Sequence, residues 1–84
     1  MSFFYVYILQ SLKDESLYIG YSHDLRRRFK EHNEGKSKAT KPFRPYKLIA
    51  YESFLDERDA KDREIYLKSG SGRAFLKKHI HLSG

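Results

Sequence analysis

Residues 3–21 read FFYVYILQSLKDESLYIGY, and this stretch decides the fold. Its first eight residues are rich in aromatic and β-branched side chains, which is typical of a strand buried on both faces. The polar segment SLKDES then separates this run from a second, shorter apolar run, LYIGY. Two such runs joined by a short polar loop predict a β-hairpin.

A helix is predicted directly after the hairpin. Ser22 or Asp24 can cap its N-terminus, and Gly35 is expected to end it. The inward stripe of this helix has the spacing i, i+4, i+7 and consists of Leu25, Phe29 and His32. Arg28, at i+3, falls on the same stripe, whereas Arg26 and Arg27 point elsewhere.

The rest of the chain predicts a third strand and two further helices. Residues 35–45, GKSKATKPFRP, have no periodicity and are expected to form a loop, in which Pro45 holds Arg44 extended. YKLIAYESF, residues 46–54, is a strand pattern. Asp56 opens a helix that runs to about Lys68, and Ser71 or a neighbour caps a last helix, which carries Ala74, Phe75 and Ile80.

This order, ββαβαα, predicts an α+β fold with a small, mainly antiparallel three-stranded sheet flanked by helices. The length of 84 residues allows one domain, expected over residues 1–84. The chain has no cysteine, which excludes disulfides and thiolate metal sites. Its longest apolar run is too short to span a bilayer, and we expect a soluble cytoplasmic protein without membrane contact.

The positive charge is concentrated in one window. The net charge is +6, and nine basic but only three acidic residues lie between His23 and Lys47, whereas the rest of the chain has eight of each. Such a concentration favours an anionic partner, nucleic acid first, over a merely solvated face. Six of these cations are candidates for nucleic-acid contacts: Arg26, Arg27, Lys36, Lys38, Lys41 and Arg44.

Two charged residues lie on predicted inward stripes. Arg28 either extends its head to solvent or is held for a purpose, and its planar fork matches a phosphate well. Glu64, between Ala60 and Leu67 at helical spacing, is either half of an internal ion pair, for instance with Arg28, or a ligand for a hard cation such as Mg²⁺. Position alone leaves both alternatives open.

Three tyrosines and a histidine complete the set of candidates. Tyr5 and Tyr7 share one face of their strand because the side-chain period is two, and Tyr18 lies on the second strand. As single residues, tyrosines in strands are usually packing residues with a wet hydroxyl. His32 likewise fits a helix-end histidine with a satisfied hydrogen bond.

These residues, taken in order, resemble the GIY-YIG nuclease superfamily over nearly the whole chain. YVY at 5–7 is similar to the first signature triplet, with Tyr5 where the family name has glycine, and YIG at 18–20 matches the second. Arg28 stands eight positions beyond the glycine of that triplet, as the family's arginine does, and AKDREIYLK is similar to the helix that supplies its metal-binding glutamate, which matches Glu64. The resemblance is closest to small stand-alone members similar to the catalytic domain of the nuclease subunit of bacterial excision repair.

The resemblance implies a metal-dependent endonuclease that hydrolyses phosphodiester bonds, with DNA as the expected substrate. In that reading Tyr7 is the general base, directly or through His32, and Tyr18 orients the water or the phosphate. Arg28 stabilises the phosphate, and Glu64 binds Mg²⁺ or Mn²⁺. The alternative is a nucleic-acid-binding module with weak or lost nuclease activity.

Overall fold

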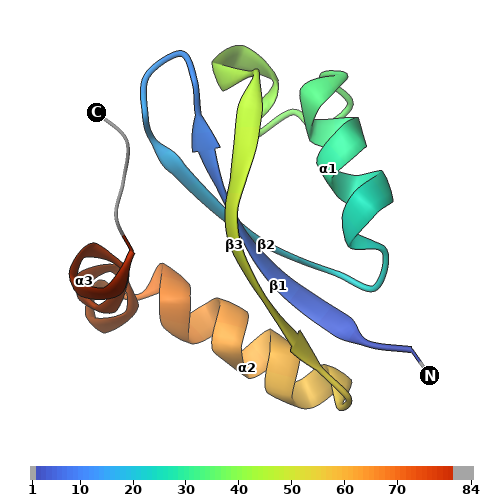
Figure 1. Ribbon diagram of the computed structural model, residues 1–84, viewed down its shortest axis with the longest axis vertical. Helices are drawn as coiled ribbons and strands as arrows, with labels where there is room; N and C mark the ends of the chain where they lie inside the picture. Colours follow the sequence, from blue (N-terminus) through green and yellow to red (C-terminus); the bar gives the residue numbers. More distant parts are fainter. Residues whose placement is uncertain (1, 81–84) are drawn as a thin grey trace.

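The computed structural model describes residues 2–80, and its elements follow the predicted order ββαβαα (Figure 1). The fold is α+β, as predicted. The elements are β1 (Phe4–Ser11), β2 (Leu17–Ser22), α1 (Leu25–Asn33), the short 3₁₀ helix η1 (Lys41–Phe43), β3 (Tyr46–Phe54), α2 (Glu57–Lys68) and α3 (Gly70–His79). The turn η1 lies in the segment that was expected to be an irregular loop.

The three strands form one antiparallel sheet in the order β2-β1-β3. The predicted hairpin is confirmed, and β1 is the central strand. Its side chains alternate between the two faces: Val6 and Ile8 point to one, Tyr7 and Leu9 to the other, and all four are at most 3% exposed. Burial on both faces explains the continuous apolar run that opens the sequence.

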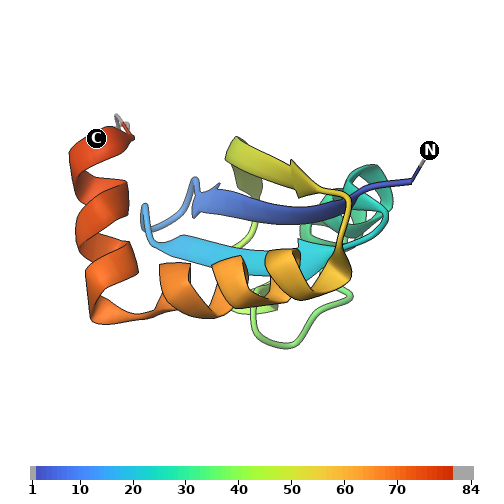
Figure 2. The ribbon, with the colours of Figure 1, turned by 90° about the horizontal axis from the view of Figure 1, so that it is seen from below.

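Helices cover both faces of the sheet and make three layers (Figures 1 and 2). Leu25 and Phe29 of α1 pack over Tyr7 and Leu9. On the opposite face, α2 runs along the sheet and α3 crosses the end of α2, and residues of both helices pack against Val6 and Ile8. None of the helices within residues 2–80 has the length and apolar character needed to cross a membrane.

The helix ends follow local chemistry. Asp24 caps α1 by accepting a hydrogen bond from the Arg27 N–H at 3.1 Å, and Gly35 adopts a left-handed φ of +78° just beyond the helix. α2 begins after its cap Asp56 and ends at Lys68, as predicted. The cap of α3 is Ser69, in the SGSG segment where Ser71 or a neighbour was predicted to cap it, and the helix begins at Gly70.

Strand β3 carries a bulge that affects the face covered by α1. Ile8 pairs with Ala50 but Leu9 pairs with Leu48, so Ile49 has no partner in the register. Because of this extra residue, Leu48 and Tyr51 lie on the same face of the sheet as Tyr7, although they are three positions apart.

Candidate functional site

Tyr7 leans across the sheet toward the β2 edge. Its backbone pairs with Gly20, and a Cβ added at Gly20 would overlap the end of the Tyr7 ring. The glycine therefore provides the space in which the ring lies. Tyr7 is 1% exposed, and burial, followed by the neighbouring Tyr18, raises its pKa to about 12.

His32 of α1 lies against this ring. Its Nε2 is 2.8 Å from the Tyr7 hydroxyl, and its Nδ1 is 2.7 Å from the hydroxyl of Thr40. Both His32 and Thr40 are fully buried. Burial, aided by the charge of Arg28, lowers the pKa of His32 to about 4, so the ring is neutral at pH 7.

Thr40 is the residue of this cluster that the sequence analysis did not identify. It lies in the cationic loop between α1 and β3, and several of its neighbours in the loop are exposed. A buried threonine within so polar a segment is the one signal that marks it, and burial is visible only in the structure.

Tyr18 also belongs to the cluster. Its ring centroid is 5.0 Å from that of His32 and 6.4 Å from that of Tyr7. The second strand therefore brings an aromatic hydroxyl to the same place as the first. Tyr5, two residues before Tyr7 on the same face, packs instead against Tyr51 at 6.0 Å.

Arg28 reaches the cluster from α1 and is partly exposed. Its Nη1 donates to Glu31 Oε1 at 3.1 Å, and its side chain is 34% exposed. The guanidinium is also close enough to Tyr7 to act against the burial that raises the pKa of the phenol. Arg28 thus lies on the inward stripe, as predicted, with its donors at the boundary between core and solvent.

Glu64 lies on α2, which packs against β1 and β2. The suggested internal pair with Arg28 is wrong: Glu64 Oε2 accepts from Lys68 Nζ at 3.0 Å, and Arg28 pairs with Glu31. The link of Glu64 to the cluster is electrostatic: after burial and Tyr18, the Glu64 charge contributes to the raised pKa of Tyr7.

The carboxylate of Glu64 fits a cation that needs few protein ligands. Within residues 2–80 no group of three His, Cys, Asp or Glu side chains could enclose a metal ion. Mg²⁺ does not require such an enclosure, because it keeps several waters and is often held by one or two carboxylates together with substrate phosphates. Glu64, a carboxylate with 21% of its side chain exposed, fits that mode.

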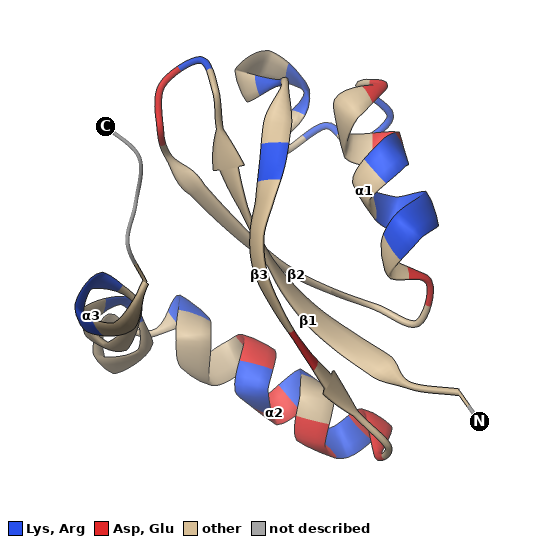
Figure 3. Cartoon of the chain, in the orientation of Figure 1, with Lys and Arg blue, Asp and Glu red and all other residues tan. Residues whose placement is uncertain are grey.

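The six cations proposed for nucleic-acid contacts are all exposed. Figure 3 shows blue segments on α1 and the loop that follows it, and others on β3, in the β1–β2 turn and on α3, whereas α2 carries both signs of charge. Arg27 pairs weakly with Asp24 at 3.9 Å and Lys36 with Glu34 at 3.3 Å. Arg26 lies elsewhere, at the rim of a pocket.

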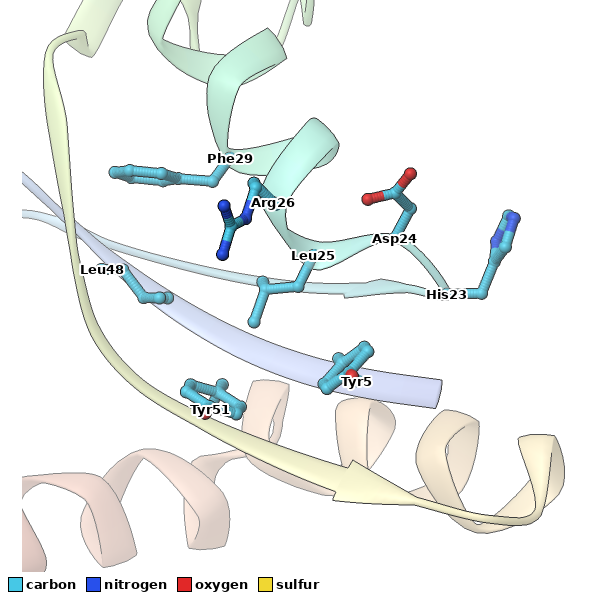
Figure 4. A pocket seen from close by; sticks show the side chains of 8 residues that line it. All are labelled: Tyr5, His23, Asp24, Leu25, Arg26, Phe29, Leu48 and Tyr51. Atoms are coloured by element: carbon cyan, nitrogen blue, oxygen red, sulfur yellow. The ribbon is translucent and has the colours of Figure 1, made fainter. Parts of the chain in front are cut away.

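This pocket, of about 440 Å³, opens between α1 and the strands β1 and β3 (Figure 4). Its walls include Tyr5, Leu25, Phe29 and Tyr51. None of the clustered residues Tyr7, Tyr18, Arg28, His32 and Glu64 lines it. The candidate site is therefore distinct from this pocket.

Nearly the whole chain matches one protein-family model. The sequence model of the GIY-YIG catalytic domain matches residues 3–78. The chain belongs to the GIY-YIG family. The two triplets meet at their ends in the sheet: Tyr7, the last residue of the first, pairs with Gly20, the last residue of the second.

The chain is also similar to several UPF0213 proteins. It is 48% identical to one from Clostridium perfringens over 76% of this chain and 69% of that protein, and 49% identical to the UPF0213 protein YazA of Bacillus subtilis over 79% and 65%. It thus spans about two thirds of the length of these two relatives. The solution NMR structure of a UPF0213 protein from Bacillus halodurans superimposes with a TM-score of 0.56 at 37% identity, covering 93% of this chain and 84% of that one.

Proposed function

We propose that this GIY-YIG protein is a divalent-metal-dependent endonuclease that hydrolyses phosphodiester bonds in nucleic acid, with DNA as the first substrate to test. One observation carries the proposal: Tyr7, Tyr18, His32 and Arg28 form one cluster at the β2 side of the sheet, and the charge of Glu64 on α2 acts on Tyr7. A cytoplasmic location, expected from the cysteine-free composition, belongs to the same proposal.

Two residues act on the phosphate. The transition state of phosphoryl transfer gathers charge on the phosphoryl oxygens, and its stabilisation is mostly electrostatic. Arg28 presents a partly exposed guanidinium whose fork can bind two of these oxygens. Glu64 would hold Mg²⁺ or Mn²⁺, which supplies charge stabilisation to the leaving 3′ oxygen.

The aromatic hydroxyls act on the water. Tyr7 is the general base in this proposal, and Tyr18 orients the water or the phosphate. Because the Tyr7 pKa is about 12, the phenol is protonated at pH 7 and can take a proton only while giving one up. The exposed cations Lys36, Lys38, Lys41 and Arg44, with Arg26 and Arg27, contact the nucleic-acid backbone without reading bases.

Nicking of supercoiled plasmid in the presence of Mg²⁺ or Mn²⁺ tests the proposal. We expect Arg28→Ala and Glu64→Gln to lower the nicking rate at least ~100-fold while the circular dichroism spectrum stays that of the parent. Asp62→Asn removes a carboxylate from an exposed position of the same helix and is the matched control. A Glu64→Gln variant that nicks as fast as the parent would refute the metal assignment.

The binding module is the second candidate, and specific features favour it. Tyr7 is 1% exposed with a strongly raised pKa, and Glu64 is already paired with Lys68. The same plasmid, followed by gel shift over a series of salt concentrations, separates the two functions. Salt-sensitive binding without metal-dependent nicking supports the module, whereas nicking that Glu64→Gln abolishes supports the enzyme.

A further inference from the structure

Behind the Tyr7 hydroxyl lies a chain of buried polar groups. It passes from Tyr7 to His32 at 2.8 Å, from His32 to Thr40 at 2.7 Å, and from Thr40 to the Ser37 carbonyl oxygen at 3.5 Å. Each of the three side chains is at most 1% exposed. Since both nitrogens of a neutral imidazole are engaged, one must donate and the other accept.

The groups at the two ends of this series of hydrogen bonds favour the same donor-to-acceptor direction, from Tyr7 toward Ser37. At one end, the Ser37 carbonyl can only accept, so the Thr40 hydroxyl donates to it and accepts from His32 Nδ1. At the other end, the Arg28 guanidinium lies near Tyr7 and has no acceptor atom, so it cannot take the phenol proton, which stays free to point at His32 Nε2. Backbone bonds hold the turn, since the N–H groups of Thr40 and Lys41 both donate to the Ser37 carbonyl, at 3.2 and 2.9 Å.

We propose that Thr40 is a positioning residue that fixes His32 as the Nδ1–H tautomer, so that Nε2 is the acceptor for the Tyr7 proton. This inference rests on the proposed nuclease function for its catalytic meaning, but the tautomer itself does not. Thr40 touches neither substrate nor metal in this scheme. It acts through His32, in the way that a hydrogen-bond partner of one ring nitrogen decides the role of the other.

The tautomer gives the proton of the attacking water a route. As the water oxygen bonds to phosphorus, its O–H bond breaks and its proton moves to the Tyr7 oxygen. At the same time the phenol gives its own proton to His32 Nε2. The ring becomes an imidazolium, and its Nδ1–H remains hydrogen-bonded to the Thr40 hydroxyl. The leaving 3′ oxygen then takes a proton from solvent, and His32 gives its proton back to solvent through Tyr7, which restores the starting protonation state. No phenolate persists, which matches a phenol whose burial opposes ionisation. Burial and Arg28 oppose the imidazolium too, so His32 holds the proton only during the step and releases it at once.

Nitrogen-15 NMR of the His32 ring tests the tautomer directly, without any nuclease assay. In the parent we expect Nδ1 to carry the proton and Nε2 to have the shift of a bare nitrogen. Thr40→Val keeps the shape but removes the acceptor, and should move the proton to Nε2. Thr40→Ser retains a hydroxyl and should keep the parental spectrum.

Nicking rates then connect the tautomer to the chemistry. We expect Thr40→Val to lower the rate about 100-fold, with plasmid affinity unchanged, and Thr40→Ser to restore most of it. A parent ring protonated at Nε2 overturns the inference whatever the activity, and so does a Thr40→Val ring that keeps Nδ1–H. If the parent has the expected tautomer but no variant or metal supports nicking, the proposed function fails and the tautomer assignment stands.

Discussion

At the level of single residues, the shape of the site depends on a side chain that is absent. Gly20 sits opposite Tyr7 on the neighbouring strand, and the end of the Tyr7 ring occupies the space of its missing Cβ. The ring cannot move away without cost, because its hydroxyl is bonded to His32. The glycine of the YIG triplet thus has a steric role in this chain.

Replacing Gly20 with alanine should therefore displace Tyr7. We expect Gly20→Ala to weaken the Tyr7–His32 bond, to lower nicking at least ~10-fold, and to destabilise the fold by about 1–3 kcal/mol, as overpacking does. Plasmid nicking and urea unfolding measure the two effects. Retention of full activity and stability would mean that the ring has another place to go.

His32 should make the stability of the fold depend on pH. Its folded pKa of about 4 lies below the ordinary 6.5, because of burial and then the charge of Arg28, partly offset by Glu31. The unfolded chain therefore binds a proton more readily. The stabilising contribution is present above pH 6.5 and is lost as the pH falls toward 4.

The size of this effect can be measured with a variant. The shift corresponds to a loss on the order of 2 kcal/mol in the free energy of unfolding between neutral pH and pH ~4.5. His32→Gln should be less stable at neutral pH but lose less on acidification, as read from urea unfolding at both pH values. Equal acid sensitivity of parent and variant would show that other groups dominate.

At the level of elements, the junction of α2 and α3 depends on a second close approach. A Cβ at Gly72 would overlap the backbone of Tyr66 and Leu67, which cannot rotate aside. Gly70, two residues earlier, has open space around its missing Cβ. The two glycines of SGSG, which look alike in the sequence as helix breaks, therefore have different roles.

This difference predicts opposite effects of the same substitution. Gly72→Ala should cost about 2 kcal/mol or more of unfolding free energy, because backbone must shift. Gly70→Ala should stay within about 1 kcal/mol of the parent, on the stabilising side, since alanine favours helix. Thermal or urea unfolding of the pair gives the comparison, and similar losses in both would contradict the close packing at Gly72.

The sequence predicted the elements well because their signals are local. The stripe of Leu25, Phe29 and His32, the cap at Asp56 and the third strand at residues 46–54 were all confirmed. The bulge at Ile49 was not predicted, since nothing in YKLIAYESF marks one. Thr40 was not identified because its contact with His32 depends on how the whole loop folds back. The catalytic roles came from the family resemblance and remain predictions.

At the level of the whole molecule, charge is segregated further than the totals inside and outside residues 23–47 indicate. The chain outside residues 23–47 is neutral on balance, yet α3 has three cations and no acidic residue: Arg73, Lys77 and Lys78. α2 is balanced within itself (Figure 3), and the compensating acidic residues lie outside both helices: Asp14, Glu15, Glu52 and Asp56. Within residues 2–80 the molecule therefore presents two cationic regions, and of these two the loop after α1 is joined directly to the candidate site, through Thr40.

This arrangement predicts that the two regions contribute differently to nucleic-acid binding. Neutralising three exposed lysines of the loop, in Lys36→Gln/Lys38→Gln/Lys41→Gln, should weaken binding to labelled duplex DNA. It should also flatten the dependence of log affinity on log salt by about 2.7, since each of the three lost phosphate contacts contributes about 0.9. The triple variant Arg73→Gln/Lys77→Gln/Lys78→Gln removes the same charge from α3 and is the matched control. Fluorescence anisotropy over a salt series measures both slopes.

If binding follows net charge alone, the two variants will lose affinity equally, and the loop will have no special place in recognition. A larger loss for the loop variant, with both variants folded, places the nucleic-acid backbone beside the Tyr7–His32 cluster.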